Sequence, residues 1–68
     1  MAKIKTKDLK IHIESHGGTL ELLTNGNYDI RKNGKSVNIG KPTNDRWECP
    51  QLRRAWGDAT GIPKIDGC

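Results

Sequence analysis

Two Asn-Gly dipeptides constrain the fold of this chain more than any other feature of its sequence. Asn25-Gly26 and Asn33-Gly34 separate three short runs in which apolar and polar residues alternate. An Asn-Gly pair between alternating runs is the strongest short-range signal for a β-hairpin, because both residue types accept the positive φ that a two-residue turn requires. The sequence therefore predicts a three-stranded antiparallel meander with strands over 19–24, 27–32 and 35–40.

The alternation gives this sheet one apolar face and one polar face. Neighbouring residues of a strand point to opposite faces, so parity assigns each of them to one face. The inward residues are Leu20, Leu22, Tyr28, Ile30, Val37 and Ile39, and the outward residues are Glu21, Leu23, Asn27, Asp29, Arg31, Ser36 and Asn38. The apolar face needs a cover, which the segments before and after the sheet must supply.

The segment before the sheet is predicted to be a helix over 7–16. Thr6 is a favourable N-cap, Leu9 and Ile13 lie one helical turn apart, and Gly17 can end a helix. Leu9, Ile11 and Ile13 also alternate, so a strand is the alternative interpretation of this segment.

The segment after the sheet is predicted to be a second helix that begins at Pro50 and ends before Gly61 and Pro63. Its apolar stripe consists of Leu52, Ala55, Trp56 and Ala59. The predicted fold class is α+β, an αβββα domain with both helices on one face of the sheet and the other face open. We expect a single domain over 1–68, with an ordered core over 6–62 and a loose tail over 64–68.

Membrane and secreted classes do not fit this sequence. It has no run of about eighteen apolar residues and no apolar signal region after Met1, so we expect a cytoplasmic protein. Cys49 lies beside a proline and Cys68 is the last residue, which does not resemble a secreted disulfide framework, and we expect no disulfide. Both histidines lie far from the cysteines, so no zinc, other metal or cofactor is expected.

The net charge is +4, and the charged residues are clustered along the chain. Residues 1–10 hold four lysines and one acid, residues 14–29 hold three acids and no Lys or Arg, and residues 31–41 hold four bases and no acid. Clustered bases favour a polyanionic ligand, because they contact phosphates and release counterions. A solvated surface that only keeps the protein soluble is a comparable explanation.

Five short motifs follow one another over residues 6–62. They are Lys7-Asp8-Leu9 in the first helix, Gly26-Asn27-Tyr28-Asp29-Ile30 on the second strand, Asn33-Gly34-Lys35 at the turn, Thr43-Asn44-Asp45-Arg46 after the third strand, and Leu52-Arg53-Arg54-Ala55 in the last helix. In this order and spacing they resemble the HicA-type mRNA interferase toxins, most closely the short phage-type members. The resemblance implies the fold of double-stranded-RNA-binding domains, RNA as the ligand, and a HicB-like antitoxin as a partner.

The chain departs from this family where the chemistry of cleavage is concerned. The family has a histidine at the start of the second strand, and the matching position here is Asn27. RNA cleavage without a metal needs a group that exchanges protons near neutral pH, which imidazole does and asparagine does not. Asn27 can still hydrogen-bond a 2′-hydroxyl or a base edge. The resemblance therefore predicts RNA binding without nuclease activity.

Two other pairs are weaker candidates for chemistry. His12 and His16 share one side of the first helix, and the favoured interpretation is that they are ordinary boundary histidines rather than catalytic or metal-binding residues. Together with Asn27, His16 is a weak candidate for a displaced catalytic residue. Asp29 and Arg31 share the outward face, where a cross-strand surface contact is the favoured interpretation.

Nucleic-acid contacts are expected from basic side chains and from exposed rings. Tyr28 and Trp56 are predicted to lie in the core, and the exposure of Trp47 is left open. The candidate nucleic-acid-binding residues are Lys32, Lys35, Lys41, Arg46, Arg53, Arg54 and Asn27, with solvated charges as an equally weighted alternative.

The leading hypothesis is a small cytoplasmic RNA-binding protein, built like a HicA toxin that has lost its histidine. The alternative is a phage-encoded inhibitor that binds a host enzyme or defence protein through the acidic segment, Leu23 and a sheet edge. A third hypothesis is an active interferase with a displaced catalytic residue. The expected partners are RNA, a HicB-like antitoxin, a host protein or a second copy of the chain, and no membrane.

Overall fold

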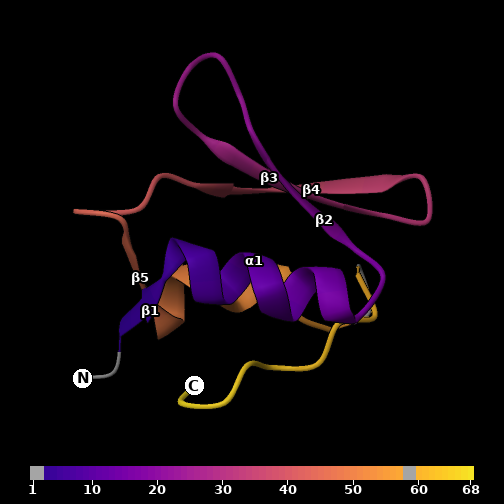
Figure 1. Ribbon diagram of the computed structural model, residues 1–68. Coiled ribbons are helices and arrows are strands. Elements are labelled where there is room, and N and C mark those ends of the chain that lie inside the picture. The colour runs from indigo at the N-terminus through magenta and orange to yellow at the C-terminus, as the bar shows by residue number, and fades with distance from the viewer. Residues whose placement is uncertain (1–2, 58–59) are drawn as a thin grey trace.

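A three-stranded antiparallel sheet and two helices make up most of the fold, which a computed structural model describes for residues 3–57 and 60–68 (Figure 1). The sheet has the order β2-β3-β4, and the helices are α1 and the 3₁₀ helix η1. The bounds are Thr19–Leu22 for β2, Tyr28–Lys32 for β3, Lys35–Gly40 for β4, Thr6–Ser15 for α1 and Cys49–Ala55 for η1. The predicted α+β class and the antiparallel meander are confirmed.

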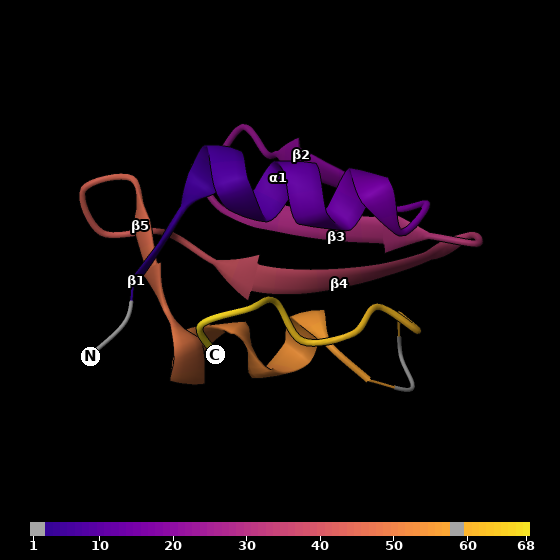
Figure 2. The same ribbon diagram turned by 60° about the horizontal axis from the view of Figure 1, so that its bottom comes forward.

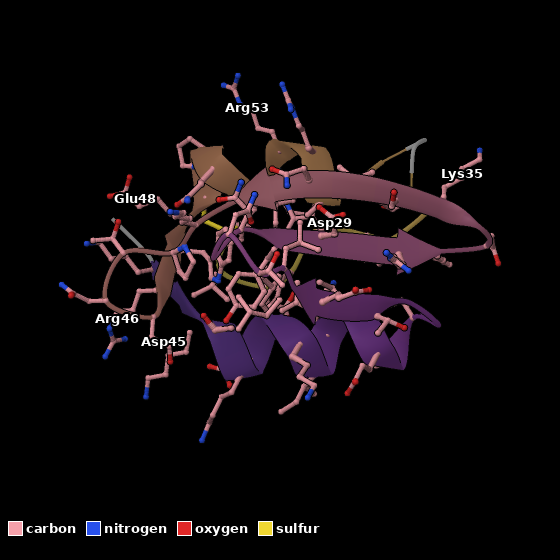
Figure 3. The ribbon with its side chains drawn as sticks, turned by 90° about the horizontal axis from the view of Figure 1, so that it is seen from above. Asp29, Lys35, Asp45, Arg46, Glu48 and Arg53 are labelled. Atoms are coloured by element: carbon pink, nitrogen blue, oxygen red, sulfur yellow. A yellow bond between two sulfur atoms is a disulfide. The ribbon has the colours of Figure 1, made fainter. Side chains whose placement is uncertain are left out.

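Both helices lie beneath the same face of the sheet (Figure 1). Seen from above in Figure 3, α1 runs along the β2 side and η1 along the β4 side, so each helix supports one edge strand. The core between these layers contains Leu9 and Ile13 from α1, Ile30 from β3 and Leu52 from η1, all fully buried. The upper face of the sheet is left open, as the alternation predicts.

Helix α1 confirms the helical interpretation of residues 9–13 and excludes the strand. Lys5 is the N-cap and makes no side-chain capping bond, so the predicted cap at Thr6 is wrong by one residue. The Thr6 hydroxyl instead accepts a hydrogen bond from Trp47 Nε1 at 3.0 Å and donates one to the Asp45 carbonyl at 3.2 Å. Ile11 points away from the core and is 63% exposed, since only residues one turn apart share the buried face.

The two hairpins differ, although both contain Asn-Gly. Asn33 and Gly34 take φ of 53° and 78° and form the predicted two-residue turn, with Lys32 opposite Lys35. The other hairpin is wider, because the Leu23 amide donates to the Asn27 carbonyl at 2.8 Å and β2 already ends at Leu22. Parity fails at this end: Leu22, predicted inward, is 60% exposed, and Leu23, predicted outward, is half-buried.

The second helix is shorter than predicted. Leu52 and Ala55 are buried, but the element is a 3₁₀ helix that ends at Ala55, and Trp56 is only half-buried. Gly57 follows with φ of 95°, a left-handed conformation that stops the helix. The buried Thr60 hydroxyl then donates to the Ala55 carbonyl at 2.8 Å and accepts from the Ile62 amide at 3.2 Å. Ala59 lies outside the described residues.

A second, two-stranded sheet was not predicted. It pairs β1 (Lys3–Lys5) with β5 (Arg46–Glu48) in antiparallel register, with Ile4 opposite Trp47. Trp47 is fully buried and Ile4 nearly so, and the edge of the Tyr28 ring meets Trp47 at 5.6 Å between ring centroids. The ordered core therefore begins before residue 6.

The C-terminal segment is packed rather than loose. It runs alongside η1 back to the β1 end of the molecule (Figure 2), where Ile65 and Cys68 are half-buried against the core. Cys68 forms a disulfide with Cys49, with the two Cα atoms 5.4 Å apart. The expectations of a loose tail and of no disulfide are both wrong, because the return of the chain to the β1 end brings together cysteines that the sequence shows only as distant.

Candidate nucleic-acid interface

The first two candidate lysines face each other across the turn between β3 and β4 but differ in exposure. Lys35 is exposed and projects from the end of the sheet (Figure 3). Lys32 is half-buried and turns toward the helix side, where a Cβ built on Gly61 would lie 3.7 Å from its Nζ. A Cβ on Gly17 would lie 4.0 Å from its Cε. The Lys32 side chain therefore lies between the end of α1 and the segment that follows η1.

Two arginines continue the positive charge along β4. Arg53 and Arg54 belong to the last turn of η1, which packs under this strand, and both are exposed. Figure 3 shows Arg53 projecting beyond the β4 edge. An open hollow of about 350 Å³ lies there, lined by both arginines together with Asn38, Ile39, Gly40, Pro50 and Gln51. We call Lys35, Arg53 and Arg54 the basic edge.

The basic edge lies on two elements without acidic residues, since neither β4 nor η1 contains Asp or Glu. Among residues 3–57 and 60–68, no ion pair forms to Lys32 or to any member of the basic edge. Since β4 is an outer strand of its sheet, the positive charges lie beside a backbone edge that carries further hydrogen-bonding groups.

The other predicted contacts do not join this surface. The Lys41 side chain lies over the β2–β3 loop, where its Cε is 3.4 Å from the Cβ that Gly26 would carry. The backbone carbonyl of Lys41 accepts a hydrogen bond from the Gln51 side chain. Arg46 lies in β5 at the opposite end, near Asp45 and Glu48 (Figure 3). Asn27 lies just before β3, in the loop, and is half-buried. The predicted set of seven therefore divides into two regions.

The open face of the sheet holds polar side chains that already bind one another. Arg31 Nε lies 3.0 Å from Glu21 Oε2, and the Asn38 side-chain amide donates to Asp29 Oδ1 at 3.0 Å. Asp29 and Arg31 therefore contact other strands rather than each other. These are the cross-strand contacts that the favoured interpretation of Asp29 and Arg31 expects.

The two histidines make structural contacts at the end of α1. His12 Nε2 lies 2.8 Å from the Pro63 carbonyl, and His16 Nδ1 lies 2.9 Å from the His12 carbonyl. A carbonyl only accepts, so each of these ring nitrogens carries a proton. His12 also meets the Trp56 ring edge-on at 5.6 Å between centroids. In the described part of the chain, no group of three or more potential metal ligands is found.

No aromatic ring is among the described residues that line the hollow beside the basic edge. Trp47, whose exposure the sequence leaves open, is fully buried. Tyr28 and Trp56, predicted to lie in the core, pack against it but are only half-buried. Binding through this surface would therefore depend on charge rather than on stacking.

One feature of the site was missed from the sequence. A second hollow of about 350 Å³ lies at the β3–β4 turn, and we call it the turn hollow. Its lining consists of Gly17, Thr19, Arg31, Lys32, Asn33, Gly34, Lys35 and Ser36. Gly17 and Thr19 are far from the turn in the sequence, and only the pairing of Thr19 with Arg31 across β2 and β3 brings them there.

Comparison with protein families, curated proteins and solved structures finds no match to this chain. Within residues 3–57 and 60–68, no helix has both the length and the apolar character needed to cross a membrane.

Proposed function

We propose that this protein binds nucleic acid, with RNA as the ligand, through the basic edge and the lysines of the β3–β4 turn. The observation that carries the proposal is the absence of acids from β4 and η1, which leaves Lys35, Arg53 and Arg54 without ion-pair partners among the described residues. β4 has six residues, so its edge is about 20 Å long. Several consecutive phosphates of one strand fit along that length.

The choice of RNA rests on the resemblance to HicA toxins. The order α1, β2, β3, β4 and η1, with both helices on one face, supports that likeness, while β1 and β5 are additional to it. Asn27 in place of the family's histidine supports binding without cleavage, since an amide does not exchange protons near neutral pH. A HicB-like antitoxin would then be a partner that covers the same surface.

A charge-matched pair of variants tests this proposal. The first carries Lys35→Gln, Arg53→Gln and Arg54→Gln, and the control carries Lys5→Gln, Lys7→Gln and Lys10→Gln, which removes the same charge from exposed positions of β1 and α1. Only the first should lose RNA retention in a filter-binding titration. The slope of log K against log salt should fall by about 2, since each phosphate contact to a single strand contributes about 0.7. Equal losses in both variants would reduce the proposal to an effect of net charge.

Nuclease activity is tested separately by incubating the protein with labelled RNA. We expect the RNA to remain intact. If it is cleaved, His16→Ala identifies the source: loss of cleavage would establish the displaced catalytic residue, and retained cleavage would reject that role for His16.

A second candidate function, binding of a host protein, is favoured by one observation. Leu22 is 60% exposed on β2, the other outer strand, next to Glu21 and the half-buried Leu23. Exposed apolar side chains on a free strand edge suit a protein partner. A pull-down with Leu22→Ser as control, with and without nuclease, separates the two functions. A partner that survives nuclease and is lost with Leu22→Ser would support protein binding.

A further inference from the structure

The turn hollow has the chemistry of an anion site. Its lining has three cationic side chains, two hydroxyls, one amide and two glycines, and no acidic residue. The backbone amides of Asn33 and Gly34 donate to no backbone acceptor in the described part of the chain. Nothing would lie within 4 Å of a Cβ on Gly34, so a ligand can reach this backbone. Hydroxyls, ammonium groups and turn amides are the donors that phosphate oxygens accept.

The charge balance indicates which kind of phosphate fits. Arg31 is held by Glu21 at 3.0 Å, so its charge is largely compensated. Lys32 and Lys35 have no ion-pair partner among residues 3–57 and 60–68 and supply two uncompensated charges. A phosphate monoester carries about −1.5 to −2 at neutral pH, whereas a phosphodiester of the RNA backbone carries only one charge. Two lysines therefore match a terminal phosphate better than an internal one.

The position of the hollow leads to the same ligand. Lys35 belongs both to the basic edge and to the hollow, which lies at the end of β4 where the sheet stops. An RNA strand that follows the basic edge toward the β3–β4 turn therefore places its terminal nucleotide at the hollow. A volume of about 350 Å³ is at the lower end of the range for ligand sites and suits a single nucleotide.

We propose that the turn hollow binds the terminal phosphate of a nucleotide or of an RNA strand, with Lys32 and Lys35 as its principal ligands. For RNA strands this inference rests on the proposed function, and it adds that a terminal phosphate is recognised rather than an internal one. Free nucleotides and strand ends carry the same terminal phosphate, and the experiment distinguishes between them.

The first measurement compares one short single-stranded RNA with a 5′-phosphate and with a 5′-hydroxyl, by fluorescence anisotropy of a 3′ label. The wild-type chain should bind the phosphorylated strand about tenfold more tightly, because one charge-assisted site is gained. Lys32→Gln should bring this ratio close to one, while the exposed Lys10→Gln should leave it unchanged. Since the end of the Lys32 side chain lies near Gly17 and Gly61, its substitution also alters the packing there, and Lys35→Gln at the open turn is therefore the second variant.

The second measurement uses adenosine 5′-monophosphate, adenosine and inorganic phosphate as probes. Shifts of the Gly17 and Gly34 amide signals with the nucleotide, but not with adenosine, would support the hollow as a site for free nucleotides. Such shifts with the phosphorylated strand alone would support strand ends as the source.

The outcomes separate the two proposals. A ratio of one in the wild type, or a preference that survives both lysine substitutions, overturns the terminal-phosphate site. If the variant without the three charges of the basic edge still binds both RNAs more weakly in that case, the proposed function stands without the terminal-phosphate site. Conversely, if adenosine 5′-monophosphate shifts the Gly17 and Gly34 amide signals and neither RNA binds, the hollow is supported as a nucleotide site and RNA is rejected as the ligand.

Discussion

The two ends of the molecule differ in how their side chains are packed. At the stapled end, defined by Ile4, Trp47 and the Cys49–Cys68 disulfide, apolar side chains are buried and two segments that are distant in sequence are joined covalently. At the turn end, defined by Gly17 and residues 32–35, the side chains are basic and polar, and they surround an open hollow. The stapled end stabilises the fold, which allows the turn end to present like charges close together.

The comparison explains how so short a chain tolerates a basic surface. A domain of this size buries a small core, so even slight repulsion among unpaired charges lowers a small total stability. The basic edge lies over η1, whose first residue is tied to the last residue of the chain by the disulfide. Anchoring η1 in this way offsets the repulsion along the edge that it supports.

Trp47→Ala should destabilise the protein by about 3–5 kcal/mol, because it removes a fully buried ring and leaves a cavity in the core where β5 pairs with β1. Urea unfolding followed by circular dichroism measures this free energy. Trp56→Ala is the matched control, since Trp56 is only half-buried and should lose clearly less. Equal losses in the two variants would mean that the stapled end contributes no more to stability than its surroundings.

Removal of the disulfide, by Cys49→Ser together with Cys68→Ser, should cost about 3 kcal/mol, because the bond closes a loop between cysteines 19 positions apart. The unfolding midpoint in urea measures the loss, and a reducing agent should reproduce it in the wild type. RNA affinity at low temperature should change less than twofold in the double variant, as its basic edge is intact. An unchanged midpoint would show that the bond does not support the fold.

Gly18→Ala should cost about 1–3 kcal/mol through overpacking. A Cβ at this buried position would lie 2.9 Å from Ile13 Cγ2 and 3.3 Å from the Arg31 carbonyl oxygen, so α1 and β3 would have to move apart. Gly34→Ala provides the comparison, since nothing lies near its Cβ and the cost of about 1 kcal/mol comes from its φ of 78° alone. If Gly18→Ala were the milder of the two in thermal unfolding, the packing behind the turn hollow would be loose.

The sequence predicts those parts of the fold that depend on local patterns. The Asn33-Gly34 turn, helix α1 and the burial of Leu9, Ile13 and Ile30 follow from turn chemistry and periodicity, and all are found. The β1–β5 pairing and the disulfide depend on contacts between distant segments. A three-residue strand such as Lys3–Lys5 has no periodic signal of its own, so it could not be recognised.

The sequence predicts which charged residues belong to the candidate site, but it does not predict how they are arranged in space. Lys35, Arg53 and Arg54 lie along one edge of the sheet because η1 packs beneath β4. Arg46 fails to join them because β5 pairs with β1 and carries it to the other end. The contribution of Gly17 and Thr19 to the turn hollow requires the register of β2 on β3, which parity alone does not give.

The smallest expected effect on stability concerns the basic edge itself. Lys35→Gln with Arg53→Gln and Arg54→Gln should change the free energy of unfolding by less than about 0.5 kcal/mol, because all three side chains are exposed and have no ion-pair partner among the described residues. Relief of repulsion should make any change a slight gain, most visible at low salt. Urea titrations at two salt concentrations, with the Lys5, Lys7 and Lys10 variant as control, measure this. A loss above about 1 kcal/mol would mean that these side chains hold η1 against β4. Weaker RNA binding by that variant would then reflect a disturbed fold. The assignment of stability to one end and of RNA binding to the other would be wrong.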